Sequence, residues 1–308
     1  MNRRNVLAMI ATGAAGVGIG RTTMVVPAPG PTDGNRLGLT ASERDDPLAA
    51  YFDRAPARVA AEVQSALRNG PLSPAQVLPR SAIAELDRPG YLAAETGYCT
   101  LPDGRGYVAV RTEMPGVTAE MIDWWFSWVN RVDLRYKIWF PGLHYRNHVT
   151  APSEAEAARL ASYPANERKA YWSSTAHPFE DVGFGPEAIA LRFIAPRDYG
   201  LGNPDFVSGK ATAICTLVGA ESMGLTHSQM CHYVRPWRGG VELRSRFWLG
   251  EDIRLPGAAG FVLAPLLGSD FVRRRVIHPN RPFDMALHCA QEYANLADIL
   301  PRLFDRYA

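Results

Sequence analysis

The feature of the sequence that most constrains the fold is a long amphipathic segment near the C-terminal end, residues 283–307, which follows a series of strand candidates. Its apolar side chains recur at helical spacing: Leu287, Tyr293, Leu296 and Leu300. Because Pro301 has no backbone N–H, we expect the helix to be kinked or broken there. A helix of this kind must bury its apolar stripe, so the sequence predicts an α+β fold in which an antiparallel sheet wraps around the C-terminal helix.

Six segments are predicted to be strands, and polar and apolar side chains alternate along the clearest of them. They are 107–113, 134–140, 188–194, 212–220, 227–237 and 241–249. The tripeptide Arg238-Gly239-Gly240 predicts a tight hairpin between the last two. Helices are predicted at 119–130, where Thr118 can cap the first turn, and within the polar insertion 153–171.

The first hundred residues divide into three predicted segments. Residues 1–30 carry Arg3 and Arg4 ahead of an uncharged stretch rich in Ala and Gly, which is the layout of a twin-arginine export signal. We therefore expect a periplasmic, cell-envelope or secreted protein, and a leader that is not cleaved would tether it to the membrane. Residues 31–47 are predicted to be a linker, 48–100 a helical N-terminal portion and 101–308 the main domain.

Composition and charge argue against two classes of protein. The 308 residues include 33 Lys and Arg against 31 Asp and Glu, a formal net charge of +2. The chain thus lacks the basic stripe that neutralises nucleic-acid phosphates, and we expect no nucleic-acid partner. No apolar run reaches the ~18 residues of a membrane span. The four cysteines leave two disulfides open but show no C-x-x-C spacing, which argues against a zinc finger or redox motif.

The predicted helix 119–130 carries an unusual load of large aromatic side chains: Trp124, Trp125, Phe126 and Trp128. Such side chains are typical of a core or of an interface between subunits. A homodimer is therefore one expectation for this chain, and contact with a ligand is the alternative.

The pair with the clearest chemical meaning is His288 and Glu292. Residues four apart on a helix lie on one face, with Cβ atoms ~5–6 Å apart, so both can reach one ion; a simple ion pair is the alternative. His144 follows a predicted strand across a Pro-Gly turn, and Glu180 and Asp181 precede another strand. Two imidazoles and two carboxylates suit Zn²⁺ with room for a water, and Mn²⁺ and Fe²⁺ are alternatives.

His232 is a further candidate because it shares one face of the predicted strand 227–237 with Met230 and Val234. On a concave face its imidazole would point into a cavity, and a hydrogen-bonded core histidine is the alternative. Three other histidines are interpreted as structural: His177, His227 and His278. His227 is also expected on the opposite face from His232. No H-E-x-x-H, G-x-S-x-G or P-loop motif is present.

Several segments, taken in order, resemble the 2,4-diacetylphloroglucinol hydrolases, a family that includes phloretin-hydrolase-like enzymes. They are Asp123-Trp124-Trp125-Phe126, residues 135–139 with His144, the Glu180-Asp181 turn, residues 242–250 and the His288/Glu292 helix. The resemblance covers roughly residues 101–300. It implies a helix-grip fold of the START/birch-allergen type, a bound zinc ion, and hydrolysis of the carbon–carbon bond between an acyl group and the phenolic ring of a small phenolic ketone.

The resemblance also implies roles for individual residues. The implied metal ligands are His144, Glu180, His288 and Glu292, with Asp181 as the alternative to Glu180. The implied catalytic residues are Tyr136, Asn147 and His232, which would hold phenolic oxygens or move protons. Phe247 departs from the pattern, because some relatives are expected to carry a tyrosine hydroxyl there, and one hydrogen bond to the substrate would then be missing.

Two other functions are compatible with the same fold. A sheet wrapped around a helix makes a cavity, so the chain could be a non-catalytic binding protein for apolar aromatic ligands. A polyketide cyclase or aromatase, which needs no metal, is the other alternative. Metal content and the release of a carboxylic acid distinguish these functions from the hydrolase.

Overall fold

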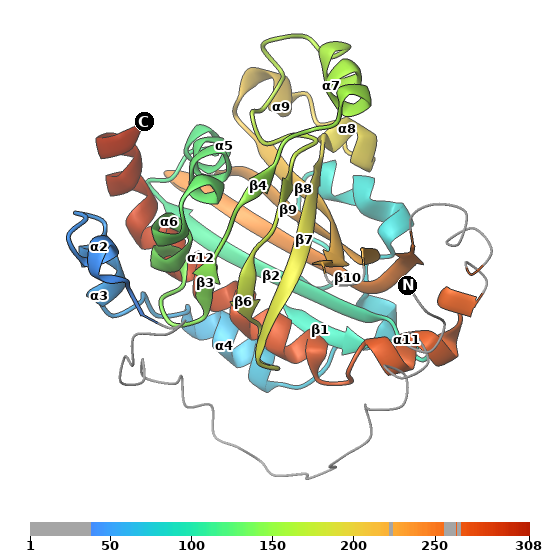
Figure 1. Ribbon diagram of the computed structural model, residues 1–308. Helices are drawn as coiled ribbons and strands as arrows, with labels where there is room; N and C mark the ends of the chain where they lie inside the picture. Colours follow the sequence, from blue (N-terminus) through green and yellow to red (C-terminus); the bar gives the residue numbers. More distant parts are fainter. Residues whose placement is uncertain (1–37, 222–223, 256–262, 264–265) are drawn as a thin grey trace.

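The computed structural model describes residues 38–221, 224–255, 263 and 266–308, which form an antiparallel sheet with helices against both faces (Figure 1). The predicted export signal lies outside the described residues, as does the first part of the predicted linker. The rest of that linker is folded, because Thr40 caps the short helix α2, Ala41–Arg44, and Leu39 is buried in the core. The described residues 38–47 therefore belong to the folded domain rather than to a linker. Among the described residues, no helix is long and apolar enough to cross a bilayer.

The segment 48–100 is largely helical. It contains α3 (Ala49–Asp53), α4 (Ala61–Arg68) and the 3-10 helices η1 (Pro74–Gln76) and η2 (Arg80–Asp87), and it ends in strand β1 (Gly97–Thr100). Val63 and Leu67 of α4 are buried in the same core as the C-terminal helix. Arg54 Nη1 also donates to Asn295 Oδ1 on that helix, at 2.9 Å. The N-terminal helices are thus packed onto the main sheet.

The sheet is antiparallel throughout, in the order β1-β2-β10-β9-β8-β7-β5-β4, with β6 also paired to β7 and β3 to β6. Its long strands are β2 (Gly106–Pro115), β7 (Pro186–Ile194), β8 (Thr212–Ala220), β9 (Leu225–Trp237) and β10 (Gly240–Arg254). The short ones are β3 (His144–Arg146), β4 (Val149–Thr150), β5 (Thr175–Ala176) and β6 (Phe179–Asp181). All predicted strands from 188 onward are confirmed. So is the β9–β10 hairpin, where Arg238 and Gly239 have φ values of 37° and 79°.

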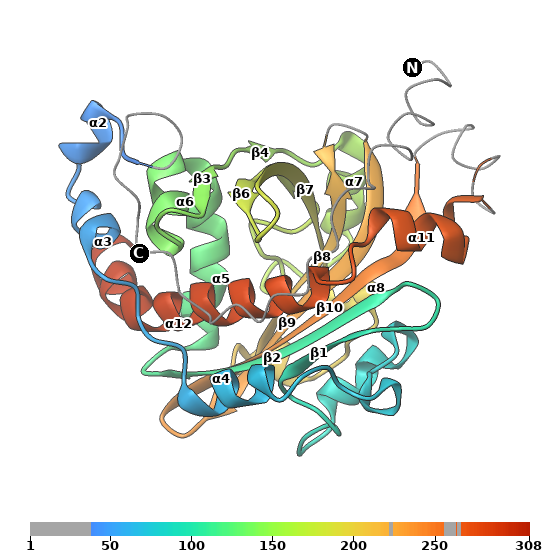
Figure 2. The same cartoon turned by 90° about the horizontal axis from the view of Figure 1, so that it is seen from below.

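The long helix α12, Arg281–Tyr307, lies along the concave side of the sheet, as Figure 2 shows. Cys289, Tyr293, Leu296 and Leu300 face the sheet and are fully buried. The predicted helix-grip arrangement is confirmed. The helix is not broken at Pro301, because Leu300 and Leu303 on either side are held in the core.

Side chains of β9 alternate between the two faces of the sheet. Met230 and Val234 belong to the core shared with α12, whereas Cys231 and Tyr233 belong to the core on the convex face. The convex core is covered by η2 and by the short helices α8 (Pro196–Tyr199) and α9 (Asp205–Ser208). His232 therefore lies on the concave face, as predicted.

One predicted strand is wrong. Residues 134–140 alternate in polarity, but they form the helix α6, Asp133–Trp139. This helix is buried on nearly all sides, and even Lys137 is only 8% exposed because its ammonium pairs with Glu43 at 2.7 Å. A helix without a solvent-facing side shows no helical period in its sequence, so the short alternation was misleading.

Four further helices lie outside the elements described above. They are α5 (Ala119–Trp128), the 3-10 helix η3 (Val129–Arg131), α7 (Glu154–Ala161) and α11 (Asp270–Val276). Thr118 Oγ1 caps α5 by accepting from the Met121 N–H. Trp125 and Phe126 are buried in the core between the sheet and α12. The aromatic residues of α5 therefore fill the domain's own core to a large extent.

Candidate metal centre

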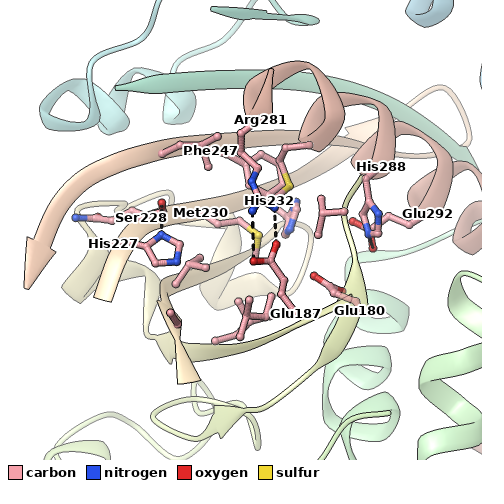
Figure 3. Close-up of a pocket in the computed structure, with 18 of the residues that line it drawn as sticks. Glu180, Glu187, His227, Ser228, Met230, His232, Phe247, Arg281, His288 and Glu292 are labelled. Carbon is pink, nitrogen blue, oxygen red and sulfur yellow. Dashed lines mark hydrogen bonds and ion pairs between the residues drawn. The ribbon is translucent and has the colours of Figure 1, made fainter. Parts of the chain in front are cut away.

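Four side chains converge where the sheet meets α12: His144, Glu180, His288 and Glu292. Figure 3 shows Glu180, His288 and Glu292. His144 begins β3, and Glu180 in β6 is its direct partner in the antiparallel register. His288 and Glu292 lie one turn apart on α12 and are both buried. Two of the four residues thus come from paired strands and two from the helix. The helix pair has the i, i+4 spacing that places both side chains on one face.

Ligand atoms of His144, Glu180 and His288 all lie within 4.8 Å of one another, which suits a single bound ion, and Glu292 approaches the two imidazoles. His144 Nε2 lies 3.3 Å from His288 Nε2, 3.3 Å from Glu180 Oε2 and 3.6 Å from Glu292 Oε2. His288 Nε2 is 3.9 Å from Glu292 Oε2. Two ligand atoms bound ~2.1 Å from one tetrahedral ion are themselves ~3.4 Å apart. The observed separations are close to that value.

The orientation of His144 leaves a lone pair directed at the cluster. Its Nδ1 lies 3.3 Å from the carbonyl oxygen of Tyr136, which can only accept, so Nδ1 carries the proton. The ring stacks on the Tyr136 ring with centroids 4.0 Å apart. A backbone carbonyl that fixes the tautomer in this way is the usual support for a metal-binding imidazole. His144 Nε2 is therefore available as a ligand.

Burial controls protonation in the cluster. It lowers the pKa of His144 well below its usual value, with the neighbouring His288 adding to the effect, and lowers the pKa of His288 to about 3. It raises the pKa of Glu180 to about 7, and burial together with the charge of Glu180 raises the pKa of Glu292 well above its usual value. The two imidazoles are thus neutral, and the two buried carboxylates resist ionisation, so the four side chains carry no positive charge among them. A divalent cation would supply that charge. The donor set fits a metal ion.

The structure distinguishes Glu180 from Asp181. Glu180 points into the cluster, where its Oε2 also accepts a hydrogen bond from the Tyr136 hydroxyl. Asp181 instead accepts from the backbone N–H groups of Gly183 and Gly185, at 2.7 and 3.0 Å, in the turn that follows β6. Glu180 is thus the carboxylate that the fold brings to the two imidazoles.

Three members of the cluster line a cavity of about 220 Å³ between the concave face of the sheet and α12. Much of the lining is apolar or aromatic: Phe126, Trp139, Ile189, Leu191, Phe193, Met230, Phe247 and Tyr293. Glu180, His288 and Glu292 are among its polar lining residues. An apolar cavity with a few converging polar groups is the usual form of a small-molecule site, and this one suits an aromatic ligand.

The three predicted catalytic residues also line this cavity. His232 Nδ1 lies 2.7 Å from Ser245 Oγ, which leaves Nε2 for a ligand, and burial lowers the pKa of His232 to about 3. Tyr136 is buried and hydrogen-bonded to Glu180, and its pKa is raised well above the usual value by burial and by that carboxylate. The fold therefore brings both side chains to the cavity.

Asn147 is held by several hydrogen bonds. Its Nδ2 donates to Asn130 Oδ1 at 2.7 Å, its Oδ1 accepts from the His177 N–H at 3.1 Å, and its backbone N–H donates to Asp133 Oδ1 at 2.9 Å. These contacts fix the amide at the cavity wall. Phe247 also lines the cavity, with its ring centroid 5.5 Å from that of His232.

The sequence did not reveal two polar features of the cavity. Arg281, at the start of α12, forms a two-point ion pair with both carboxylate oxygens of Glu187 on β7 (Figure 3). Both residues lie just outside the segments predicted as helix and strand. His227 also lines the cavity, although it was predicted on the opposite face. The register between β8 and β9 shifts around His227, because Val218 pairs with Ser228 and Gly219 with Thr226.

The chain is similar to known proteins over most of its length. The family model of the DAPG hydrolase PhiG domain matches residues 78–305. Phloretin hydrolase from Eubacterium ramulus is 32% identical over 277 residues, which cover 89% of this chain and 94% of that protein. A 2,4-diacetylphloroglucinol hydrolase from Pseudomonas sp is 29% identical, with 87% and 90% covered. A solved START superfamily protein from Mycobacterium smegmatis aligns with a TM-score of 0.30 and 11% identity, over 62% of this chain and 96% of that one.

Proposed function

Because the chain belongs to the DAPG hydrolase family, we propose that it is a metal-dependent hydrolase that cleaves the carbon–carbon bond between an acyl group and a phloroglucinol-type phenolic ring. The observation that carries the proposal is the convergence of His144 with Glu180, His288 and Glu292, the last three of which line an aromatic-lined cavity. Zn²⁺ matches this set of ligands best, and Mn²⁺ and Fe²⁺ are the alternatives.

The reaction requires a ring carbon to leave with the electrons of the bond. Water adds to the acyl carbonyl carbon, the carbon–carbon bond breaks, and the products are a carboxylic acid and a ring that has gained a proton. Hydroxyl groups beside the acyl group let the ring hold the departing electrons as an enolate. A divalent ion held by the four residues would polarise the acyl carbonyl and acidify a water molecule.

His232 is proposed to deliver the proton to the ring carbon. Its imidazole is neutral, since burial lowers the pKa to about 3, and Ser245 fixes Nδ1. A neutral imidazole with one free nitrogen can accept a proton from a phenolic hydroxyl and pass it to the neighbouring ring carbon. A positioned acid–base group of this kind accelerates a reaction by ~10²–10⁴-fold.

Tyr136 and Asn147 are proposed to position the ring. Asn147 is fixed by its bonds to Asn130 and His177, so its amide presents polar atoms at a constant place in the cavity wall. Tyr136 is fixed by stacking on His144 and by its hydrogen bond to Glu180. Rigid partners for phenolic oxygens favour one orientation of the ring and stabilise the negative charge that develops on it.

The first experiment measures metal content and product together. Purified protein is analysed for bound metal and is then incubated with phloretin and with 2,4-diacetylphloroglucinol. The proposal expects one equivalent of metal that is lost in His288→Ala and in Glu292→Ala, together with release of a carboxylic acid. Metal-free wild type that binds the phenols unchanged would favour a binding protein, and an isomer of unchanged mass would favour a cyclase.

Export and oligomeric state also remain proposals. We propose that residues 1–30 direct twin-arginine export and that a retained leader would tether the chain to the membrane. We also propose a homodimer as one assembly state, in which α5 would contribute the half-buried Trp124 to the interface. Cell fractionation of wild type and an Arg3→Lys/Arg4→Lys variant tests export, with retention of the variant in the cytoplasm as the expected result. Equal distribution of the two would contradict it. Light scattering measures the oligomeric state.

A further inference from the structure

A second group of potential metal ligands lies at the edge of the sheet, apart from the cavity. β4 and β5 pair in the register Val149–Ala176 and Thr150–Thr175. One position further along this register His148 lies opposite His177, and the His177 N–H donates to the His148 carbonyl at 2.9 Å. The two imidazole rings are stacked, with centroids 4.5 Å apart and an interplanar angle of 10°. The fold therefore holds two imidazoles side by side as a cross-strand pair.

A carboxylate from a third segment completes the group. Glu221 follows directly after β8, and its Oε1 lies 3.4 Å from His177 Nδ1. One ligand atom from each of His148, His177 and Glu221 lies within 4.8 Å of the other two. The 3.4 Å separation equals the ~3.4 Å expected between two ligands of one tetrahedral ion. The three residues can therefore reach one ion once the two imidazole rings turn out of their parallel stack, because the lone pair of an imidazole lies in the plane of its ring.

The environment of His177 favours a ligand at Nδ1. Its Nε2 lies 2.9 Å from Thr150 Oγ1, which can accept the ring proton and fix the tautomer. Nδ1 is buried and makes no hydrogen bond in the part of the chain that the structure describes, although Glu221 is near.

We propose that His148, His177 and Glu221 form a second divalent-metal site, which takes Zn²⁺ or a similar ion of the late first transition row, with water completing the coordination. Two imidazoles and one carboxylate with an open position match the ligand preferences of this class of ion. His148 and Glu221 are exposed, so the ion reaches the site directly from solvent. The site is weaker than the buried cluster, because it has one protein ligand fewer.

Occupation of this site is expected to stabilise the cavity wall. The His177 N–H donates to Asn147 Oδ1 as well as to His148, so an ion at the site would tie β4, β5 and the end of β8 together beside Asn147. We expect a rise in thermal stability at Zn²⁺ concentrations above those that fill the buried cluster. The inference is independent of the proposed reaction.

The test is a Zn²⁺ titration of the chelator-treated full chain, followed by equilibrium dialysis with metal analysis. The proposal expects wild type to bind two equivalents of Zn²⁺. His148→Ala and the nearly isosteric Glu221→Gln should each lose only the more weakly bound equivalent. His288→Ala should lose only the more tightly bound one. Thr150→Val, which removes the hydrogen bond to His177, is expected to weaken the second site by ~10–100-fold. His278→Ala removes an exposed histidine elsewhere and serves as the matched control.

Circular dichroism of each variant checks that it is folded. A wild type that binds a single equivalent, removed by His288→Ala, would overturn the inference, and so would a second equivalent that survives in both His148→Ala and Glu221→Gln. A wild type whose only equivalent is lost in His148→Ala would instead support the second site while refuting the metal centre of the proposed function. The two proposals can therefore fail separately.

Discussion

The buried carboxylate of Glu180 should make the metal-free protein measurably sensitive to pH. Burial raises its pKa from 4.5 to about 7 in the folded chain. An acid with a higher pKa in the folded state binds more protons when folded, so the stability it contributes is present below pH ~4.5 and is lost as pH rises through ~7. At ~1.36 kcal/mol per pH unit, the whole difference is worth about 3 kcal/mol.

The buried histidines change the stability with pH in the opposite direction to Glu180. A variant of Glu180 is therefore needed to separate the two effects. The lowered pKa values of His144, His288 and His232 favour the folded state as pH rises to ~6.5. Glu180→Gln keeps the shape of the side chain and removes its ionisation, so the difference between wild type and variant measures this carboxylate together with its effect on the pKa of Glu292. Without metal, the variant should gain about 2–3 kcal/mol relative to wild type between pH 5 and pH 8.

The assay is urea unfolding of chelator-treated protein at pH 5 and pH 8, repeated with excess Zn²⁺. Glu62→Gln, which removes an exposed carboxylate of α4, is the matched control and should follow wild type at both pH values. Zn²⁺ should reverse the order, because wild type binds the ion better than Glu180→Gln and is stabilised by mass action, by ~2.7 kcal/mol at 100 times the dissociation constant. A pH-independent difference between Glu180→Gln and wild type in the absence of metal would refute the reasoning.

Three further predictions follow from individual side chains. His232→Ala should keep its metal but lose ~10²–10⁴-fold in turnover, and wild-type turnover measured by acid release would contradict the proton-transfer role. Tyr293→Phe should leave the free energy of unfolding, measured in urea, unchanged or raise it by up to ~1 kcal/mol, because the buried hydroxyl has no partner among the described residues. A fall in the free energy of unfolding by more than ~1 kcal/mol would contradict this. Glu95→Gln should cost ~3–5 kcal/mol in the same assay, because Arg244 and Arg246 would be buried without their carboxylate, and a loss below 1 kcal/mol would show that the ion pairs matter little.

The parts of the fold that the sequence predicted are those with a clear two-sided pattern. β8, β9 and β10 separate two cores, so their side chains alternate, and α12 has one buried face. α6 lacks such a pattern because it is buried on nearly all sides, and its buried Lys137 gave a false polar position. Where burial is uniform, periodicity carries no information on the type of element.

The candidate site was predictable in part for a similar reason. The i, i+4 pair His288 and Glu292 is a local pattern, and its geometry follows from the helix alone. The approach of His144 to Glu180 depends on the pairing of β3 with β6, and the sequence could only place both near turns. The position of His227 depends on a register shift between β8 and β9, which a strict two-residue alternation cannot foresee.

The most direct test of the central claim is acid release from an acylated phloroglucinol by one protein preparation in three states. These are metal-loaded, chelator-treated, and reconstituted with one equivalent of Zn²⁺. The account predicts one carboxylic acid and one deacylated ring per turnover in the first and third states, and loss of both in the second. Acid release that persists after the metal has been removed, or a fully loaded protein that releases none from any acylated phloroglucinol, would contradict it.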